Sequence, residues 1–501
     1  MTGTLLVCAP SGREATHLRQ APAAPAVART GVGPLASARA AASPRVRHAD
    51  ALAVVGIGAG VAAGLAPGDV VVASEVRPPH GAALPCSSAP LLAHALRRQG
   101  LPVHVGPVAS VTHVVTNRDR RALAATGVLA ADMESVWLLR PAQAGARAVV
   151  RVVADPAGEP LLRPGTLAHV RRALATLPEL APALTAWGAA AGPHRVLLAG
   201  PRSFCAGVVR AIEVVDRALD QRGAPVYVRK QIVHNSHVVR RLQERGAVFV
   251  DELDEVPAGA TVIFSAHGVA PQVRAQANRR GLQVIDATCP LVAKVHAEVR
   301  RFADGGDTVI LIGHHGHEEA VGTMGERPGA TVLVQDRDEA ERVQVPDPTR
   351  VSYLVQTTLA ADEVSGIVQV LARRFPHLQA PPSEDICYAT TNRQLALRAV
   401  TGQAQLVLVV GSANSSNSQR LVETARRCGV PAHLIDDVGG LDLGWLAGVA
   451  TVGLTAGASA PQELVDEVVT AIGGLGPLQV HEARLVEENV HFNVPKEVRT
   501  S

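Results

Sequence analysis

Short apolar runs alternate with segments of helical spacing along most of this 501-residue chain. This alternation is typical of parallel sheets with helices on both faces, so it predicts an α/β fold. The C-terminal part contains predicted strands at 195–200, 225–229, 261–266, 283–288, 308–313, 351–356, 405–411 and 450–457. The N-terminal part contains predicted strands at 4–10, 51–58, 69–76 and 148–155 and a predicted helix at 89–99.

Three cysteines, Cys205, Cys289 and Cys387, each follow a short apolar run that we interpret as a strand, with spacings of 84 and 98 residues. One thiol therefore falls in each of three successive strand–turn–helix units, which predicts three similar subdomains around a shared centre. Three isolated thiolates cannot all pair as disulfides, but they can hold a metal centre with one coordination position open. A single free cysteine is often only a small buried hydrophobe, and Cys8, Cys86 and Cys428 fit that interpretation.

Composition limits the class of protein. Only 2% of the residues are aromatic against 47% hydrophobic, so the cores must be built from Ala, Val and Leu. The net charge of +3 is too small to indicate nucleic-acid binding. No long apolar run indicates a membrane span, the first residues do not resemble a signal peptide, and six scattered cysteines favour a reducing cytoplasm.

The segment 184–193, LTAWGAAAGP, is small, rich in Gly and Ala, and ends in proline. We expect a linker at 184–194 between an N-terminal domain, 1–183, and a C-terminal domain, 195–501.

Histidines recur where predicted strands of the C-terminal domain end, at His234, His267 and His317. Imidazole N–H groups are good donors to phosphate oxygens. Further donors lie between a predicted strand and a helix, where backbone N–H groups also face an anion: Ser415, Ser416 and Asn417, with Ser459 in a later loop. Glu319 and the hydroxyl of Thr357 form a plausible proton-delivery pair.

The C-terminal domain resembles the 4-hydroxy-3-methylbut-2-enyl diphosphate reductases, which catalyse the last step of the non-mevalonate route to isoprenoids. The motifs that carry the resemblance are FCAGV, IVHN, VIFSAHGV, DATCPLV, GTMG, QTTL, EDICYATTNRQ, SSNS and TAGASAP. The chain departs from the usual residues of that family at Ser203 (usually Gly), Val209, Lys230, Gln231, His315 and Val321.

The resemblance implies that Cys205, Cys289 and Cys387 hold a [4Fe-4S] cluster with one iron left without a protein ligand. It implies that the diphosphate is bound by His234, His267, Ser415, Ser416, Asn417 and Ser459. It also implies that Glu319 relays a proton, that His317 and Thr357 place the substrate hydroxyl, and that ferredoxin or flavodoxin supplies electrons. The products would be isopentenyl and dimethylallyl diphosphates.

The N-terminal domain resembles the nucleoside phosphorylase and nucleosidase superfamily through TGVGP, GIGAG, AADMES and RVVAD. The resemblance implies that Glu134 binds ribose hydroxyls of a purine nucleoside and that Asp155 protonates the leaving base, while Glu14 matches an early acidic residue.

Two other hypotheses compete with the iron–sulfur reductase. One is a nucleoside-binding protein whose C-terminal half is a degenerate, regulatory diphosphate-binding module. The other is a zinc hydrolase that holds its metal with the same three thiolates.

Overall fold

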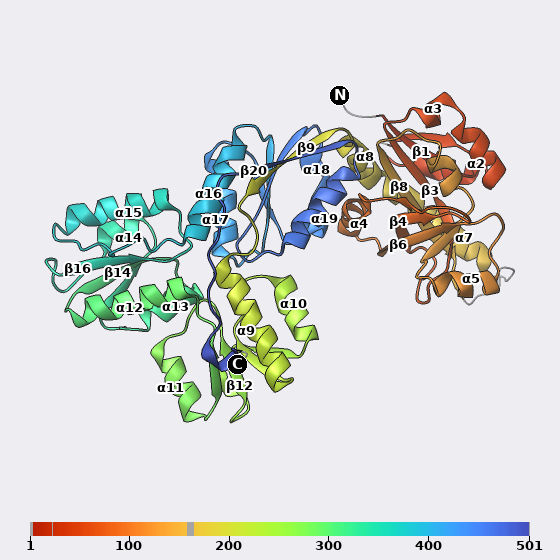
Figure 1. Cartoon of the computed structure of the whole chain (residues 1–501). Coiled ribbons are helices and arrows are strands. Elements are labelled where there is room, and N and C mark those ends of the chain that lie inside the picture. The colour runs from red at the N-terminus through yellow and green to blue at the C-terminus, as the bar shows by residue number, and fades with distance from the viewer. Residues whose placement is uncertain (1–3, 23, 158–164, 500–501) are drawn as a thin grey trace.

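The computed structural model describes residues 4–22, 24–157 and 165–499, and its sheets fall into an N-terminal and a C-terminal unit (Figure 1). The predicted α/β class is confirmed. Among the described residues, no helix is both long and apolar enough to cross a lipid bilayer.

The N-terminal unit is built on one mixed sheet in the order β2-β1-β3-β7-β6-β4-β5, with β8 paired to both β3 and β4. Its strands are β1 (Leu5–Ala9), β2 (Ala26–Arg29), β3 (Ala51–Gly60), β4 (Val70–Arg77), β5 (Leu84–Pro85), β6 (Val103–Ser110), β7 (Ala130–Asp132) and β8 (Ala146–Asp155). Its helices are α1 (Gly12–Arg19), α2 (Pro34–Ala41), α3 (Pro44–Arg47), α4 (Ala89–Arg98), α5 (Asn117–Ala124), α6 (Ser135–Leu139), α7 (Thr166–Thr176), η1 (Leu177–Leu180) and α8 (Ala181–Ala190). The four predicted strands and the predicted helix at 89–99 are confirmed.

The C-terminal unit contains three separate sheets in which every pairing is parallel, as the alternating pattern predicted. The first has the order β11-β10-β12-β13, the second β15-β14-β16, and the third β18-β17-β19-β9-β20. Their different strand numbers mean that an internal repeat stays a prediction.

The strands of the C-terminal unit are β9 (His194–Gly200), β10 (Val226–Arg229), β11 (Ala247–Val250), β12 (Thr261–Phe264), β13 (Gln283–Asp286), β14 (Thr308–Ile312), β15 (Thr331–Val334), β16 (Val351–Val355), β17 (Leu406–Val410), β18 (Ala432–Ile435), β19 (Thr451–Ala456) and β20 (Leu478–Arg484). Its helices are α9 (Ala206–Arg222), α10 (Ser236–Glu244), η2 (Leu253–Glu255), α11 (Pro271–Arg279), α12 (Pro290–Asp304), α13 (Glu318–Met324), α14 (Arg337–Arg342), α15 (Ala361–Arg374), α16 (Tyr388–Thr401), α17 (Ser416–Arg427), η3 (Val438–Gly440), α18 (Leu443–Leu446), α19 (Gln462–Gly473) and η4 (Lys496–Val498).

The chain crosses from one sheet to the next three times. It leaves β9 of the third sheet for β10 of the first through α9, and leaves β13 of the first for β14 of the second through α12. It returns from the second sheet to β17 of the third through α16. These three crossover helices lie in different parts of the unit (Figure 1).

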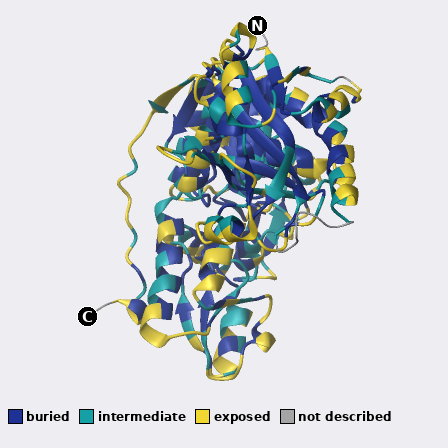
Figure 2. Cartoon of the chain, turned by 90° about the vertical axis from the view of Figure 1, so that its right-hand side faces the viewer, coloured by how far each residue is buried: buried dark blue, intermediate teal, exposed yellow. Residues whose placement is uncertain are grey.

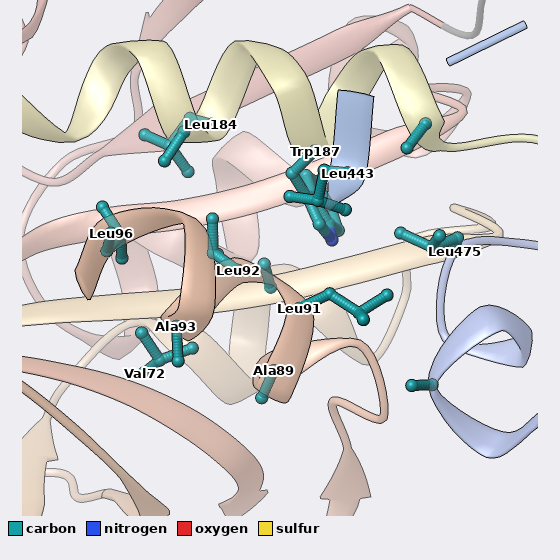
Figure 3. Packing of buried hydrophobic residues seen from close by; sticks show 14 of the residues in the cluster. Val72, Ala89, Leu91, Leu92, Ala93, Leu96, Leu184, Trp187, Leu443 and Leu475 are labelled. Atoms are coloured by element: carbon teal, nitrogen blue, oxygen red, sulfur yellow. The ribbon is translucent and has the colours of Figure 1, made fainter. Parts of the chain in front are cut away.

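The predicted linker at 184–194 differs from the expectation, because it is helical as far as Ala190 and its large side chains are buried. Leu184 and Trp187 lie in an apolar core that also contains Leu443 and Leu475 of the third-sheet region (Figure 3). The small residues of the segment allow close packing: a Cβ on Gly188 would lie 2.7 Å from the Leu5 side chain. The segment is therefore a docking helix rather than an exposed tether.

Candidate active site

Each of the three cysteines occupies the N-cap position of a crossover helix: Cys205 of α9, Cys289 of α12 and Cys387 of α16. The prediction that each follows a strand is correct for Cys205 and Cys289, which come after β9 and β13. It is wrong for Cys387, because α15 and an irregular segment separate this residue from β16. The property that all three share is the helix N-terminus, whose partial positive charge favours an anionic thiolate.

The three thiols line one cavity of about 110 Å³. A Cβ on Gly207 would lie 2.8 Å from the Cys289 sulfur and 3.8 Å from the Cys205 sulfur, so only glycine fits between these two side chains. No group of three His, Cys, Asp or Glu side chains in the described part of the chain is close enough to hold a single metal ion.

Burial controls the protonation of two of these thiols. It raises the pKa of Cys289 to about 11 and that of Cys387 to about 12, and the neighbouring thiols add to the effect. Both side chains are therefore neutral at physiological pH until a cation stabilises the thiolate.

Three histidine rings form a compact group on another wall of the cavity. The rings of His234 and His267 are stacked with centroids 4.1 Å apart, and His317 meets them edge-on at 5.7 and 5.9 Å. Burial, followed by the neighbouring imidazoles, lowers the pKa of His234 to about 2 and that of His317 to about 4. These two rings are therefore neutral and offer one N–H donor each.

The tautomer of His317 follows from its position at the N-cap of α13. Its Nδ1 accepts a hydrogen bond of 3.2 Å from the backbone N–H of Glu319, so the proton of the neutral ring must lie on Nε2. His317 thus caps α13 through its Nδ1 and presents the N–H of its Nε2 in the wall of the cavity.

Glu319 is 2% exposed and is held by a single residue of the neighbouring loop. Its Oε1 accepts from the Thr357 backbone N–H at 2.7 Å, and its Oε2 accepts from the Thr357 hydroxyl at 3.0 Å. Burial raises the pKa of Glu319, although the bonds from Thr357 act in the opposite direction. A buried carboxyl with a raised pKa is suited to hold and release a proton.

Hydroxyl and amide groups close the remaining side. Ser415 caps α17, and the Asn417 side chain accepts from the Ala458 backbone N–H at 2.9 Å. Ser459 donates to the His234 carbonyl at 2.9 Å, and Thr358 donates to the Ser416 hydroxyl at 3.1 Å. These contacts join different sheets of the C-terminal unit around the cavity.

All the C-terminal residues that the sequence predicted as functional line this cavity together. Their roles stay predictions, but their convergence is a property of the structure. Gly207 and Thr390 also line the cavity, although their sequence context did not predict it. Thr390 lies three residues after Cys387, on the same face of α16, and this helical spacing could have identified it.

Two of the unusual residues noted in the sequence have left-handed backbone conformations. Ser203 has φ of 62° and Lys230 has φ of 58°. This region disfavours residues with a Cβ, so both turns need support from their surroundings. Val321, by contrast, is exposed on α13 and leaves the cavity lining unchanged.

A second cavity, of about 330 Å³, lies in the N-terminal unit and is lined by Glu14, Glu134 and Asp155. The carboxylates that line this cavity are held by hydrogen bonds or ion pairs to other protein groups. Glu14 accepts from the backbone N–H groups of Ser11 at 2.6 Å and Ile57 at 2.8 Å. Asp155 forms an ion pair with the buried Arg120.

Glu134 lies 3.5 Å from the buried Arg151 and accepts from the Gly33 backbone N–H at 3.0 Å. Burial raises its pKa, and Arg151 opposes that effect. Arg151 also forms an ion pair with the buried Asp132 at 2.9 Å, so its charge is balanced by carboxylates on both sides.

The fold and the cavity define an α/β protein in which three parallel sheets enclose a site with thiols, neutral histidines and one buried carboxyl. Residues 196–473 match the family model described as LytB protein, and residues 12–185 match the model of the phosphorylase superfamily. The chain belongs to the LytB family, and its N-terminal unit resembles the phosphorylase superfamily. Both expected resemblances are confirmed.

Individual relatives match the C-terminal unit over nearly their whole length. The chain is 58% identical over 318 residues to 4-hydroxy-3-methylbut-2-enyl diphosphate reductase 2 of Mycobacterium bovis, covering 63% of this chain and 97% of that protein. It is 56% identical over 309 residues to the reductase of Leifsonia xyli, covering 62% and 92%. The solved structure of E-1-hydroxy-2-methyl-but-2-enyl-4-diphosphate reductase from Plasmodium falciparum has 39% identity and a TM-score of 0.58, covering 61% of this chain and 97% of that one.

We expect Glu319→Gln to stabilise the protein relative to the wild type as the pH rises from acidic to neutral. Because folding raises the pKa of Glu319 above 4.5, the folded state binds more protons than the unfolded state, and stability is lost as pH rises through this range. Glutamine has no such dependence. We expect the free energy of urea unfolding, measured at several pH values, to fall less steeply with rising pH for Glu319→Gln than for the wild type.

The control is Glu467→Gln, which changes an exposed carboxylate on α19. Parallel pH profiles for the wild type and Glu319→Gln would contradict the inferred burial of a proton-binding carboxyl.

Proposed function

We propose that this chain reduces 4-hydroxy-3-methylbut-2-enyl diphosphate to isopentenyl and dimethylallyl diphosphates. The observation that carries the proposal is one cavity lined by three thiols, three histidines and a buried carboxyl, in a chain 58% identical to a protein named for this reaction. The cavity therefore contains thiols that can hold a redox centre, histidines that can bind an anion, and a carboxyl that can release a proton.

We propose that Cys205, Cys289 and Cys387 hold a [4Fe-4S] cluster. Their shared cavity, the glycine between two of the sulfurs and the three helix N-termini all fit a bulky anionic group. When bound, the cluster supplies electrons one at a time and a Lewis-acidic iron that has no protein ligand. Side chains alone cannot supply such electrons.

The diphosphate is bound, in this proposal, by the donors on the opposite wall. His234 and His267 donate imidazole N–H groups, and Ser415, Ser416, Asn417 and Ser459 add hydroxyl and amide donors. Because His234 is neutral in the protein, it meets the diphosphate as an N–H donor rather than as a fixed cation. His267 lies 3.3 Å from the Glu318 carboxylate, so the diphosphate competes with that contact.

Glu319 supplies the proton that allows the substrate hydroxyl to leave as water. The overall reaction takes up two electrons and two protons, breaks one C–O bond and forms one C–H bond. Hydroxide is a poor leaving group, so protonation at its oxygen lowers the barrier. Thr357 holds both carboxyl oxygens of Glu319 and, with His317, orients the hydroxyl group.

Ferredoxin or flavodoxin is the electron donor that we propose, by analogy with the family. A cytoplasmic location suits a chain whose six cysteines are all free thiols.

The N-terminal domain has a second proposed function, the binding of a purine nucleoside. Glu134 faces the cavity and suits a pair of ribose hydroxyls, and Asp155 suits a base nitrogen. For Asp155 to protonate a leaving base, its carboxylate must first be released from Arg120. Binding therefore requires less rearrangement than cleavage.

We also propose a division of labour between residues 1–183 and 195–501, with 184–194 as the connecting segment. All the groups that we assign to the reductase lie after Arg195, while Glu134 and Asp155 lie before the connection.

Serine at Cys205, Cys289 or Cys387 should remove the brown colour and most of the bound iron. Serine at Cys8, Cys86 or Cys428 should leave both unchanged, because these thiols lie outside the cavity. Absorption spectra and iron analysis of anaerobically reconstituted protein make the comparison. Stoichiometric zinc without iron in the wild type would refute the cluster.

Glu319→Gln should keep the cluster and substrate binding but lower kcat about 10²–10⁴-fold, the usual contribution of a proton-transfer group. His234→Ala should mainly raise KM, because it removes a diphosphate donor. Both are measured with dithionite and a viologen dye. Normal turnover by Glu319→Gln would mean that another group delivers the proton.

Glu134→Ala should weaken adenosine binding to the full-length chain by at least about tenfold, since it removes a bidentate acceptor for two hydroxyls. Isothermal titration calorimetry measures the affinity, and the reductase assay serves as the control because the change lies in the other unit. Equal adenosine affinities would show that the N-terminal cavity does not bind ribose through this residue.

A further inference from the structure

A basic side chain on α9 links the first two cysteine turns. Arg210 lies five residues after Cys205, on the helix that Cys205 caps. Its guanidinium donates to the backbone carbonyls of Ala287 at 2.9 Å and Thr288 at 3.0 Å, which directly precede Cys289. Arg210 is 8% exposed, so these bonds form in a largely dry environment.

The same arrangement occurs at the next crossover. Lys294 lies five residues after Cys289, on the helix that Cys289 caps. Its ammonium group donates to the carbonyls of Ser383 at 3.0 Å and Glu384 at 2.9 Å, and to the Asp385 side chain at 3.1 Å. These acceptors form the irregular segment before Cys387, where no strand fixes the chain.

Arg393 makes the corresponding contact from the helix of the third cysteine, Cys387. It lies six residues after Cys387 on α16 and is fully buried. It donates two bonds to the Ser203 carbonyl, at 2.7 and 3.2 Å, in the left-handed turn before Cys205. Each cation thus belongs to the helix of one cysteine and binds the turn of the next.

The C-terminal segment that follows β20 contacts two of these cations, Arg393 and Arg210. Figure 2 shows this segment as an extended and largely exposed run along one side of the molecule. Its Glu488 carboxylate accepts from Arg393 at 3.1 Å, and its Asn493 carbonyl accepts from Arg210 at 2.8 Å. Lys294 has a comparable carboxylate partner in Asp385, with which it forms an ion pair.

We propose that Arg210, Lys294 and Arg393 form a cyclic set of positioning residues that fixes the three cysteines relative to one another. The three turns belong to crossovers between different sheets, and no backbone pairing joins them. Charge-assisted hydrogen bonds to the turn carbonyls supply that connection, and they hold the unusual Ser203 turn in place. None of the three cations lines the cavity, so each acts through a cysteine rather than on a ligand.

The cyclic order makes a directional prediction that a general loss of stability would not produce. Lys294→Met should expose Cys387, the next cysteine, and not Cys289 on its own helix. We expect iodoacetamide to alkylate Cys387 about tenfold faster in full-length Lys294→Met than in wild type. The lost hydrogen bonds stabilise the closed turn before Cys387, so their removal raises the population of the open turn about tenfold. Mass spectrometry of the protein before any iron is added gives the rate at each cysteine.

Arg301→Met is the matched control, because Arg301 is exposed on the same helix and does not contact the turn. Arg210→Lys is a milder second variant that keeps the charge and loses the forked contact, and it should accelerate Cys289 rather than Cys205. Equal acceleration at all three cysteines, or none, would overturn the proposal.

A second readout rests on the proposed function, because it requires the cluster. After anaerobic reconstitution, Lys294→Met should lose iron to a chelator about tenfold faster than wild type, and Lys294→Arg should restore retention. If wild type binds no iron, the cluster assignment fails while the alkylation result still decides the cyclic set. Iron loss from Lys294→Met at the wild-type rate would count against the set.

Discussion

The C-terminal unit depends on three sheet-to-sheet crossovers whose helices begin at one point. Each crossover helix carries unpaired N–H groups and partial positive charge at its N-terminus. Three such ends meet here, each with a cysteine at the N-cap. The arrangement concentrates a field that favours anions in a cavity that is also lined by imidazole, hydroxyl and amide groups.

Burial opposes the effect of the helix N-termini and determines how the side chains of the cavity are protonated when no ligand is bound. It keeps the thiols of Cys289 and Cys387 protonated and the rings of His234 and His317 neutral. The side chains of the wall therefore carry little charge of their own. Charge enters with the ligands, and a desolvated site with fixed donors interacts more strongly with a developing charge than water does.

The sequence was sufficient to predict the site because its residues have distinctive chemistry. Cys, His and Glu at the ends of apolar runs pointed to the cavity even though 182 positions separate Cys205 from Cys387. Most strands were also predictable, since buried parallel strands are apolar throughout. The strand β6 was missed because Gly106 and Pro107 interrupt it, and the helical character of 184–190 was hidden by a composition typical of linkers.

Other features have no local signal. Gly207 matters because two sulfurs from different helices flank it, and that relation exists only after folding. The contacts of Arg210, Lys294 and Arg393 join residues 77 to 190 positions apart. Their regular placement after each cysteine becomes meaningful only when the acceptor carbonyls are known.

The shared core between the two units has a consequence for their solubility. Helices α4 and α8 cover Leu441, Leu443, Leu446 and Leu475 of the third-sheet region, and Arg98 pairs with Asp442 at the margin. Separation of the units would expose this apolar surface to water and create a site for aggregation. Each unit therefore covers apolar surface of the other, and a substitution in the shared core of either unit must preserve the fit of both.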